Sequence, residues 1–184
     1  MSHNLGYVAI DLSNASRQML FNSICQNIPE KNYFQSLDLD YTYINGNVSQ
    51  KGHITLCYGI KNSDLKKKFK AAKLKLTWQH SALIEDIQIN LGYGGKYYIV
   101  VAIPEIHEDI FSYDQWIRNN NNIISGSSFF NPHLALCYIK NLNNNYLSKI
   151  LKTLREKLVG KTIEFESVNF YPPKDQEKIN LIKL

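Results

Sequence analysis

Residues 53–62, HITLCYGIKN, return in nearly the same form as residues 133–141, HLALCYIKN. With one gap at Gly59, the two segments share His, Leu, Cys, Tyr, Ile, Lys and Asn. Both are short, largely apolar runs, which predicts two β-strands. A capping sequence and an amphipathic helix pattern follow each of them, so the chain is predicted to consist of two halves built alike.

The elements around these segments also repeat. A strand is predicted over residues 7–12, followed by a helix capped by Ser13 or Asn14, with Leu20, Phe21, Ile24 and Ile28 on one face. In the second half, residues 101–104 echo residues 8–11, and a helix-like stretch with Ile106, Ile110, Phe111 and Trp116 follows. Asn143–Asn145 cap a well-patterned helix that ends near Leu158.

These patterns predict an α+β fold with two pseudo-symmetric lobes of antiparallel sheet flanked by helices, with a cleft between the lobes. We expect a single domain over residues 1–184. Its lobe-forming repeats are placed roughly at 5–75 and 96–160, and its closing strands at 81–91, 162–171 and 178–184.

Composition limits the class of protein. The chain has 184 residues, with 44% hydrophobic and 20% charged side chains, as expected for one soluble globular domain. No apolar run approaches the roughly 18 residues of a membrane span, and no secretory signal pattern begins the sequence. Three cysteines without a CxxC pair favour neither a disulfide framework nor a zinc site, so we expect a cytoplasmic protein.

The net charge of +5 and the pI of about 9.0 favour polyanionic partners. A cluster of lysines over residues 66–75 lies on a predicted helix. Its charge pattern is typical of a solvated helix face, and a phosphate-attracting patch is the alternative.

The histidines of the two repeats indicate acid–base chemistry. Side chains alternate along a strand, so His53, Thr55 and Cys57 are predicted on one face, with Leu56 and Tyr58 on the other. If a pseudo-two-fold axis relates the halves, His53 and His133 line one cleft. One imidazole can then accept a proton from the nucleophile while the other donates a proton to the leaving oxygen. Histidine has an unperturbed pKa near 6.5, which suits both tasks. Such a scheme needs neither a metal nor a cofactor.

The motifs resemble those of the 2H phosphoesterase superfamily, which is defined by two His-x-Thr/Ser motifs on strands. Residues 7–12 are similar to the first strand of its 2′-5′ RNA ligase (LigT)-like branch, residues 52–59 to its first motif and residues 130–136 to its second. The resemblance implies that His53 and His133 are catalytic and that Thr55 binds phosphate. It also implies a nucleotide substrate: a 2′,3′-cyclic phosphate, a 2′-5′ linkage or a cyclic nucleotide. The branch further resembles phage phosphodiesterases that destroy the cyclic-oligonucleotide alarm signals of bacterial immunity.

The sequence departs from that pattern at Ala135, where the motif has Thr or Ser. A lost hydrogen bond to a charged group costs roughly 1.5–3 kcal/mol, or about 10- to 150-fold in rate. Enzymatic acceleration is usually at least about 10⁶-fold, so the change is expected to weaken an enzyme and not to abolish it. Two alternatives stay open: a module that binds a nucleotide without cleaving it, and an RNA-binding adaptor that uses its lysines. The sequence leaves the oligomeric state open.

Overall fold

The computed structural model describes residues 5–34, 52–60, 79–120, 131–172 and 178–184. The lysine-rich helix predicted near residues 66–75 lies outside these ranges, as does the end of the first predicted repeat. The strands are β1 (Gly6–Leu12), β2 (His53–Ile60), β3 (Ser81–Leu91), β4 (Tyr97–Pro104), β5 (Leu134–Lys140), β6 (Thr162–Tyr171) and β7 (Ile179–Lys183). The α-helices are α1 (Asn14–Asn27), α4 (Glu108–Asn120) and α5 (Asn144–Leu158), and short 3₁₀ turns are η1 (Glu30–Asn32) and η3 (Tyr93–Gly95).

All seven strands pair antiparallel in the order β1-β2-β5-β4-β3-β6-β7, with a further pairing between β1 and β6. They form two groups, β2-β1-β6-β7 and β5-β4-β3. The groups join where Ile54 pairs with Leu134, and where residues 81–83 pair with residues 162–164. The predicted α+β class with antiparallel sheet is therefore confirmed, and the two strand groups form one continuous sheet.

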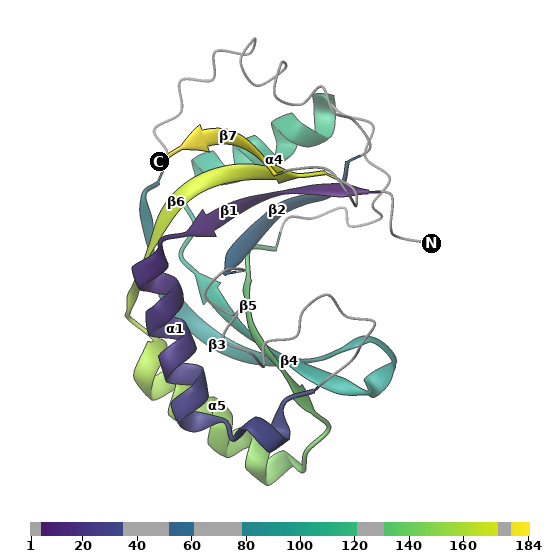
Figure 1. Ribbon diagram of the computed structural model, residues 1–184, viewed down its shortest axis with the longest axis vertical. Helices are drawn as coiled ribbons and strands as arrows, with labels where there is room; N and C mark the ends of the chain where they lie inside the picture. The colour runs from purple at the N-terminus through teal and green to yellow at the C-terminus, as the bar shows by residue number, and fades with distance from the viewer. Residues whose placement is uncertain (1–4, 35–51, 61–78, 121–130, 173–177) are drawn as a thin grey trace.

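The helices cover the two strand groups unequally. Figure 1 shows α1 and α5 side by side against β3 and β5, while α4 lies near β2 and β7 at the other end of the molecule. Ser13 and Asn143 cap α1 and α5 by accepting hydrogen bonds from Ser16 N and Tyr146 N, which confirms both predicted helix starts. Leu20 and Ile24 on α1 and Leu154 on α5 are buried, as their helical spacing predicts.

The prediction for α4 was wrong in its details. The helix begins at Glu108, so Ile106 precedes it. Phe111 is 39% exposed, whereas Tyr113 and Ile117 are almost fully buried. Ile110, Tyr113 and Ile117 keep helical spacing, and Phe111 lies off that face.

The two halves of the sheet carry the same irregularity. In β2, Ala9 pairs with Thr55 and Val8 with Cys57, which leaves Leu56 as an extra residue; in β5, Val101 pairs with Ala135 and Val100 with Cys137, which leaves Leu136. Both are β-bulges at the third residue after the motif histidine. The shared bulge is structural evidence for two halves built alike.

A second irregularity explains the gap in the sequence match. Tyr7 pairs with Tyr58 and Gly6 with Ile60, so Gly59 is unpaired, whereas β5 runs from Tyr138 to Lys140 without interruption. Gly59 has φ of 93°, in a region that other residues rarely adopt. The extra residue is thus accommodated by a glycine bulge.

The register also corrects the predicted correspondence of the first strands. Ala102 pairs with Leu134 as Ile10 pairs with Ile54. Residues 100–103, and not 101–104, are therefore the counterpart of residues 8–11. Ile103 takes the place that Asp11 has in the first half.

Candidate active site

The two motif histidines lie next to the point at which β2 and β5 pair. Ile54 and Leu134 are opposite each other, both are buried, and each directly follows a motif histidine. Side chains alternate along strands, so His53 and His133 both lie on the opposite face from this pair. They are diagonal neighbours across an antiparallel pair, a relation that spans about 7–8 Å. His53 is half-buried and His133 is exposed, so both rings are accessible to solvent.

The bulges decide which other side chains share the face of the histidines. Thr55 and Ala135 lie two residues beyond their histidines, before the bulge, and both are half-buried on this face. Beyond the bulge the alternation reverses. Tyr58 pairs with Tyr7 and Tyr138 with Ile99, so both tyrosines lie on the histidine side. The predicted placement of Tyr58 on the face opposite His53 was therefore wrong, because strict alternation does not allow for an inserted residue.

The same reversal removes the cysteines from the site. Cys57 pairs with the buried Val8 and Cys137 with the buried Val100, so both thiols face the core and not the histidines. Burial raises the pKa of Cys57 to about 11, and it raises the pKa of Cys137 as well. Neither thiol is suited to act as a nucleophile near neutral pH.

Alkylation of the folded protein with iodoacetamide at pH 8 is expected to modify Cys25, which is exposed, and to leave Cys57 and Cys137 intact. Peptide mass mapping before and after unfolding measures this directly. Rapid labelling of Cys57 without unfolding would contradict its placement in the core.

His133 has its ring oriented by the main chain. Its Nδ1 lies 2.9 Å from the carbonyl oxygen of Asn131. A carbonyl can only accept, so the neutral ring carries its proton on Nδ1 and its lone pair on Nε2. Pro132 joins these two residues and restricts the backbone between them. This is the tautomer that a general base uses.

His53 is held among aromatic rings. Its ring centroid lies 5.4 Å from that of Tyr7 in a stacked arrangement and 6.0 Å from that of Tyr171. Tyr7 and Tyr171 stack on each other at 4.7 Å with an interplanar angle of 9°. Stacking of this kind restricts the imidazole to one orientation on the sheet.

A second aromatic group lies further along β5, around Tyr138, five residues after His133. Tyr138 contacts Tyr97 edge-on at 5.7 Å, and Tyr97 stacks on Phe34 at 4.8 Å. The histidine face thus has Tyr7, Tyr58 and Tyr171 in the first half of the sheet and this group in the second half. Base stacking on an aromatic side chain contributes about 1–3 kcal/mol per base. Sequence analysis could not select these tyrosines, because the bulges determine their direction.

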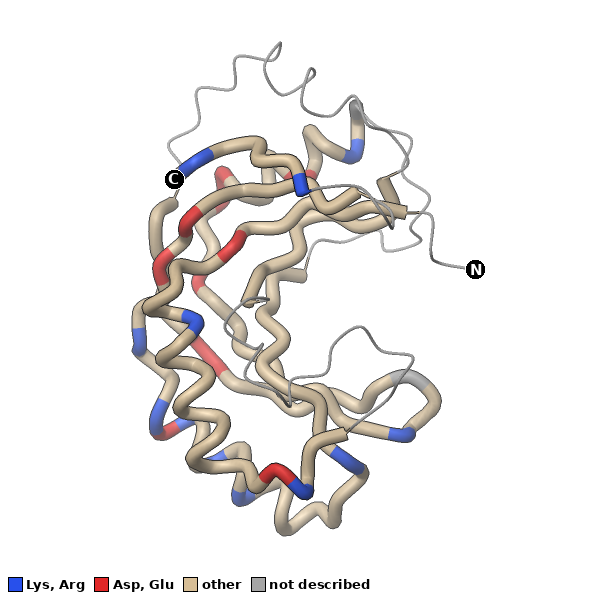
Figure 2. The backbone as a smooth tube through the Cα atoms, viewed as in Figure 1, with Lys and Arg blue, Asp and Glu red and all other residues tan. Residues whose placement is uncertain are grey.

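In the described part of the chain, charged side chains lie around the first motif and not on its strand. Figure 2 shows Lys and Arg mainly on the helices and the ends of strands, and β2 contains no Lys, Arg, Asp or Glu. Asp11, whose Cα pairs with that of His53, is buried and bonded to Lys178 at 2.8 Å. Among the described residues, no group of three or more His, Cys, Asp and Glu side chains could hold a metal ion.

None of the helices in the described part of the chain is both long and apolar enough to span a membrane.

Comparison with solved structures defines the fold further. Usb1 from Kluyveromyces marxianus has 9% sequence identity and a TM-score of 0.60, with 98% of this chain and 99% of Usb1 covered. LigT from E. coli in complex with 3′-AMP has 12% identity and a TM-score of 0.57, with 98% and 97% covered. No family model matches the sequence, and no curated protein matches it.

The chain therefore has the fold of Usb1 and LigT over nearly its whole length. LigT is the protein after which the branch suggested by the two motifs is named, so the predicted fold is confirmed. At 9–12% identity the similarity concerns the fold alone.

Proposed function

We propose that this protein is a metal-independent phosphodiesterase of the 2H type that cleaves a nucleotide phosphodiester. His53 and His133 are its acid–base pair, and Thr55 binds a non-bridging phosphate oxygen. The observation that carries the proposal is the placement of both histidines on one face, related by the Ile54–Leu134 pair. Two imidazoles in this relation can serve opposite sides of one phosphate.

The substrate class follows from the surroundings of the histidines. Tyr58, which is 39% exposed, and the half-buried Tyr138 lie on the histidine face and offer stacking surfaces for a base. Solved structures of similar fold hold nucleotides: Usb1 with uridine monophosphate, and LigT with 3′-AMP or ATP. We propose a 2′,3′-cyclic or 2′-5′ RNA end, or a cyclic-oligonucleotide signal, as the substrate. Action against bacterial immune signals and a cytoplasmic location belong to the same proposal, as does a single domain over residues 1–184.

The proposal is tested with a panel of 2′,3′-cyclic nucleotides, 2′-5′ oligoadenylate and cyclic di- and trinucleotides. We expect one class to be cleaved with EDTA present, with products identified by mass spectrometry. Turnover that is lost with EDTA and returns with a divalent ion would contradict a metal-independent mechanism.

Ala135 favours a second candidate, a module that binds a nucleotide and does not cleave it. Its methyl group occupies the register position in which the first half has the hydroxyl of Thr55. Calorimetry followed by mass analysis distinguishes the two functions. Stoichiometric binding with the ligand recovered intact supports the binder, whereas catalytic turnover supports the enzyme.

A further inference from the structure

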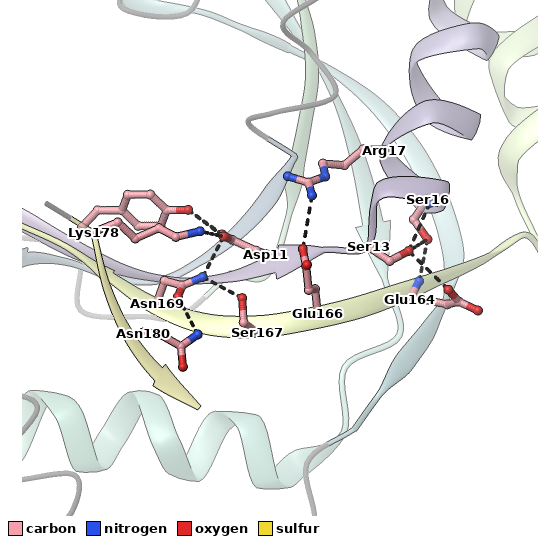
Figure 3. A network of polar contacts seen from close by, with 11 residues as sticks. Asp11, Ser13, Ser16, Arg17, Glu164, Glu166, Ser167, Asn169, Lys178 and Asn180 are labelled. Carbon is pink, nitrogen blue, oxygen red and sulfur yellow. Dashed lines mark hydrogen bonds and ion pairs between the residues drawn. The ribbon is translucent and has the colours of Figure 1, made fainter. Parts of the chain in front are cut away.

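A buried carboxylate lies beside the site without a role in the proposed acid–base chemistry. Asp11 is 4% exposed and accepts hydrogen bonds from three side chains. They are Asn169 Nδ2 at 2.7 Å, Lys178 Nζ at 2.8 Å and the Tyr171 hydroxyl, which lies 2.7 Å from each carboxylate oxygen. Figure 3 shows Asp11 between Lys178 and Asn169, with Ser167 and Asn180 extending the network.

Tyr171 connects this network to His53. Its hydroxyl bonds to Asp11, while its ring stacks on Tyr7 at 4.7 Å, and Tyr7 stacks on His53 at 5.4 Å. Lys178 Nζ also lies 5.6 Å from the centre of the Tyr171 ring. The position of the Tyr171 ring is thus determined at both its hydroxyl and its face.

The hydroxyl of Tyr171 stays protonated as a donor. Burial, together with the adjacent carboxylate of Asp11, raises its pKa. The bond to Asp11 therefore persists across the pH range in which an acid–base enzyme works.

The second half shows that the fold does not need a carboxylate here. Ile103 is the counterpart of Asp11, and β4 and β5 pair beside it with the same bulge. Burying a carboxylate is costly, and an apolar residue of similar volume is often at least as stable. Only the first half buries a carboxylate at this position, despite its energetic cost. This difference points to a role for Asp11 at His53.

We infer that Asp11 is a positioning residue, which holds the Tyr171 and Tyr7 rings so that they fix the orientation of the His53 imidazole. This inference rests on the proposed function for its catalytic consequence. Displacement of a catalytic group by about 1 Å can cost about 10²-fold in rate. Because Asp11 is almost fully buried, we expect its removal to act on turnover more than on binding.

Asp11→Asn and Tyr171→Phe test the inference, since each keeps the volume of the side chain and removes the charge or the hydroxyl. We expect kcat toward 2′,3′-cyclic AMP to fall about 10- to 100-fold, with KM unchanged within about twofold. In two-dimensional NMR spectra the ring signals of His53, shifted by the neighbouring aromatic rings, should move toward the values of a free histidine. Those of His133 should stay.

Asp114→Asn is the matched control. Asp114 is also 4% exposed and is paired with Arg118 at 2.8 Å, but it lies on α4 near Cys57, whose thiol faces the core and not the histidines. We expect this variant to lower thermal stability and to leave kcat and the His53 signals unchanged. Equal losses of kcat in all three variants would overturn the inference, as would unmoved His53 signals in Tyr171→Phe. Lack of turnover by the unmodified protein would instead defeat the proposed function, while the NMR signals would still decide the positioning.

Discussion

His53→Ala and His133→Ala are each expected to lower kcat by about 10²–10⁴-fold, the usual contribution of a general acid or base. Both rings lie on one face of the sheet, one residue from the pair that joins β2 to β5. Each serves a different proton in the same reaction, so neither can replace the other. Single-turnover kinetics on the substrate found in the nucleotide panel measure the loss without interference from product release.

The double variant should be little worse than either single variant, because both groups act in one transition state. His107→Ala is the control: His107 is 58% exposed in its side chain and pairs with Asp109 at 3.2 Å. We expect it to retain full activity. Full activity in both His53→Ala and His133→Ala would rule out the two-histidine mechanism. Circular dichroism checks that each variant is folded.

Ala135→Ser is expected to raise kcat by as much as about 10- to 150-fold, because it supplies the hydrogen bond to phosphate that the second motif lacks. Ala135 occupies the register position of Thr55, two residues after its histidine and before the bulge. It is half-buried, so a single added oxygen has access to the face of the histidines. The measurement is kcat for the variant and the natural chain under identical conditions.

Thr55→Val is the reciprocal test, since valine keeps the branched shape and removes the hydroxyl. A loss of about 10- to 150-fold is expected. If Thr55→Val leaves kcat unchanged, Thr55 does not bind phosphate in the transition state. If the natural chain only binds and Ala135→Ser begins to cleave, the protein is a binder derived from an enzyme.

Much of the local structure could be predicted from the sequence because local chemistry determines it. Ser13 and Asn143 cap their helices through side-chain oxygens, and residue type alone indicates this. The repeated His-containing segments were predicted as strands because they are short, largely apolar runs. Their similarity also predicted two related halves, which the shared bulges support.

The directions of side chains beyond Leu56 and Leu136 could not be predicted. A bulge is a tertiary feature: it depends on the register with β1 and β4, and an apolar residue such as leucine gives no local signal for it. Cys57 and Tyr58 were therefore assigned to the wrong faces. The buried face of α4 differs from the predicted one for a similar reason. Packing in the folded chain buries Tyr113 and Ile117 and leaves Phe111 exposed.

By itself, the sequence determined the strands, the helix caps, the duplicated plan and which two histidines stand in the repeated motifs. All of these are properties of residue type and short-range spacing. The tertiary structure alone decided that the histidines share one face, through the pairing of Ile54 with Leu134, 80 residues apart. It also brought Asp11 to Tyr171, which is 160 residues away along the chain. Such contacts depend on strand order and register, because burial of the whole sheet selects them and no short segment encodes them.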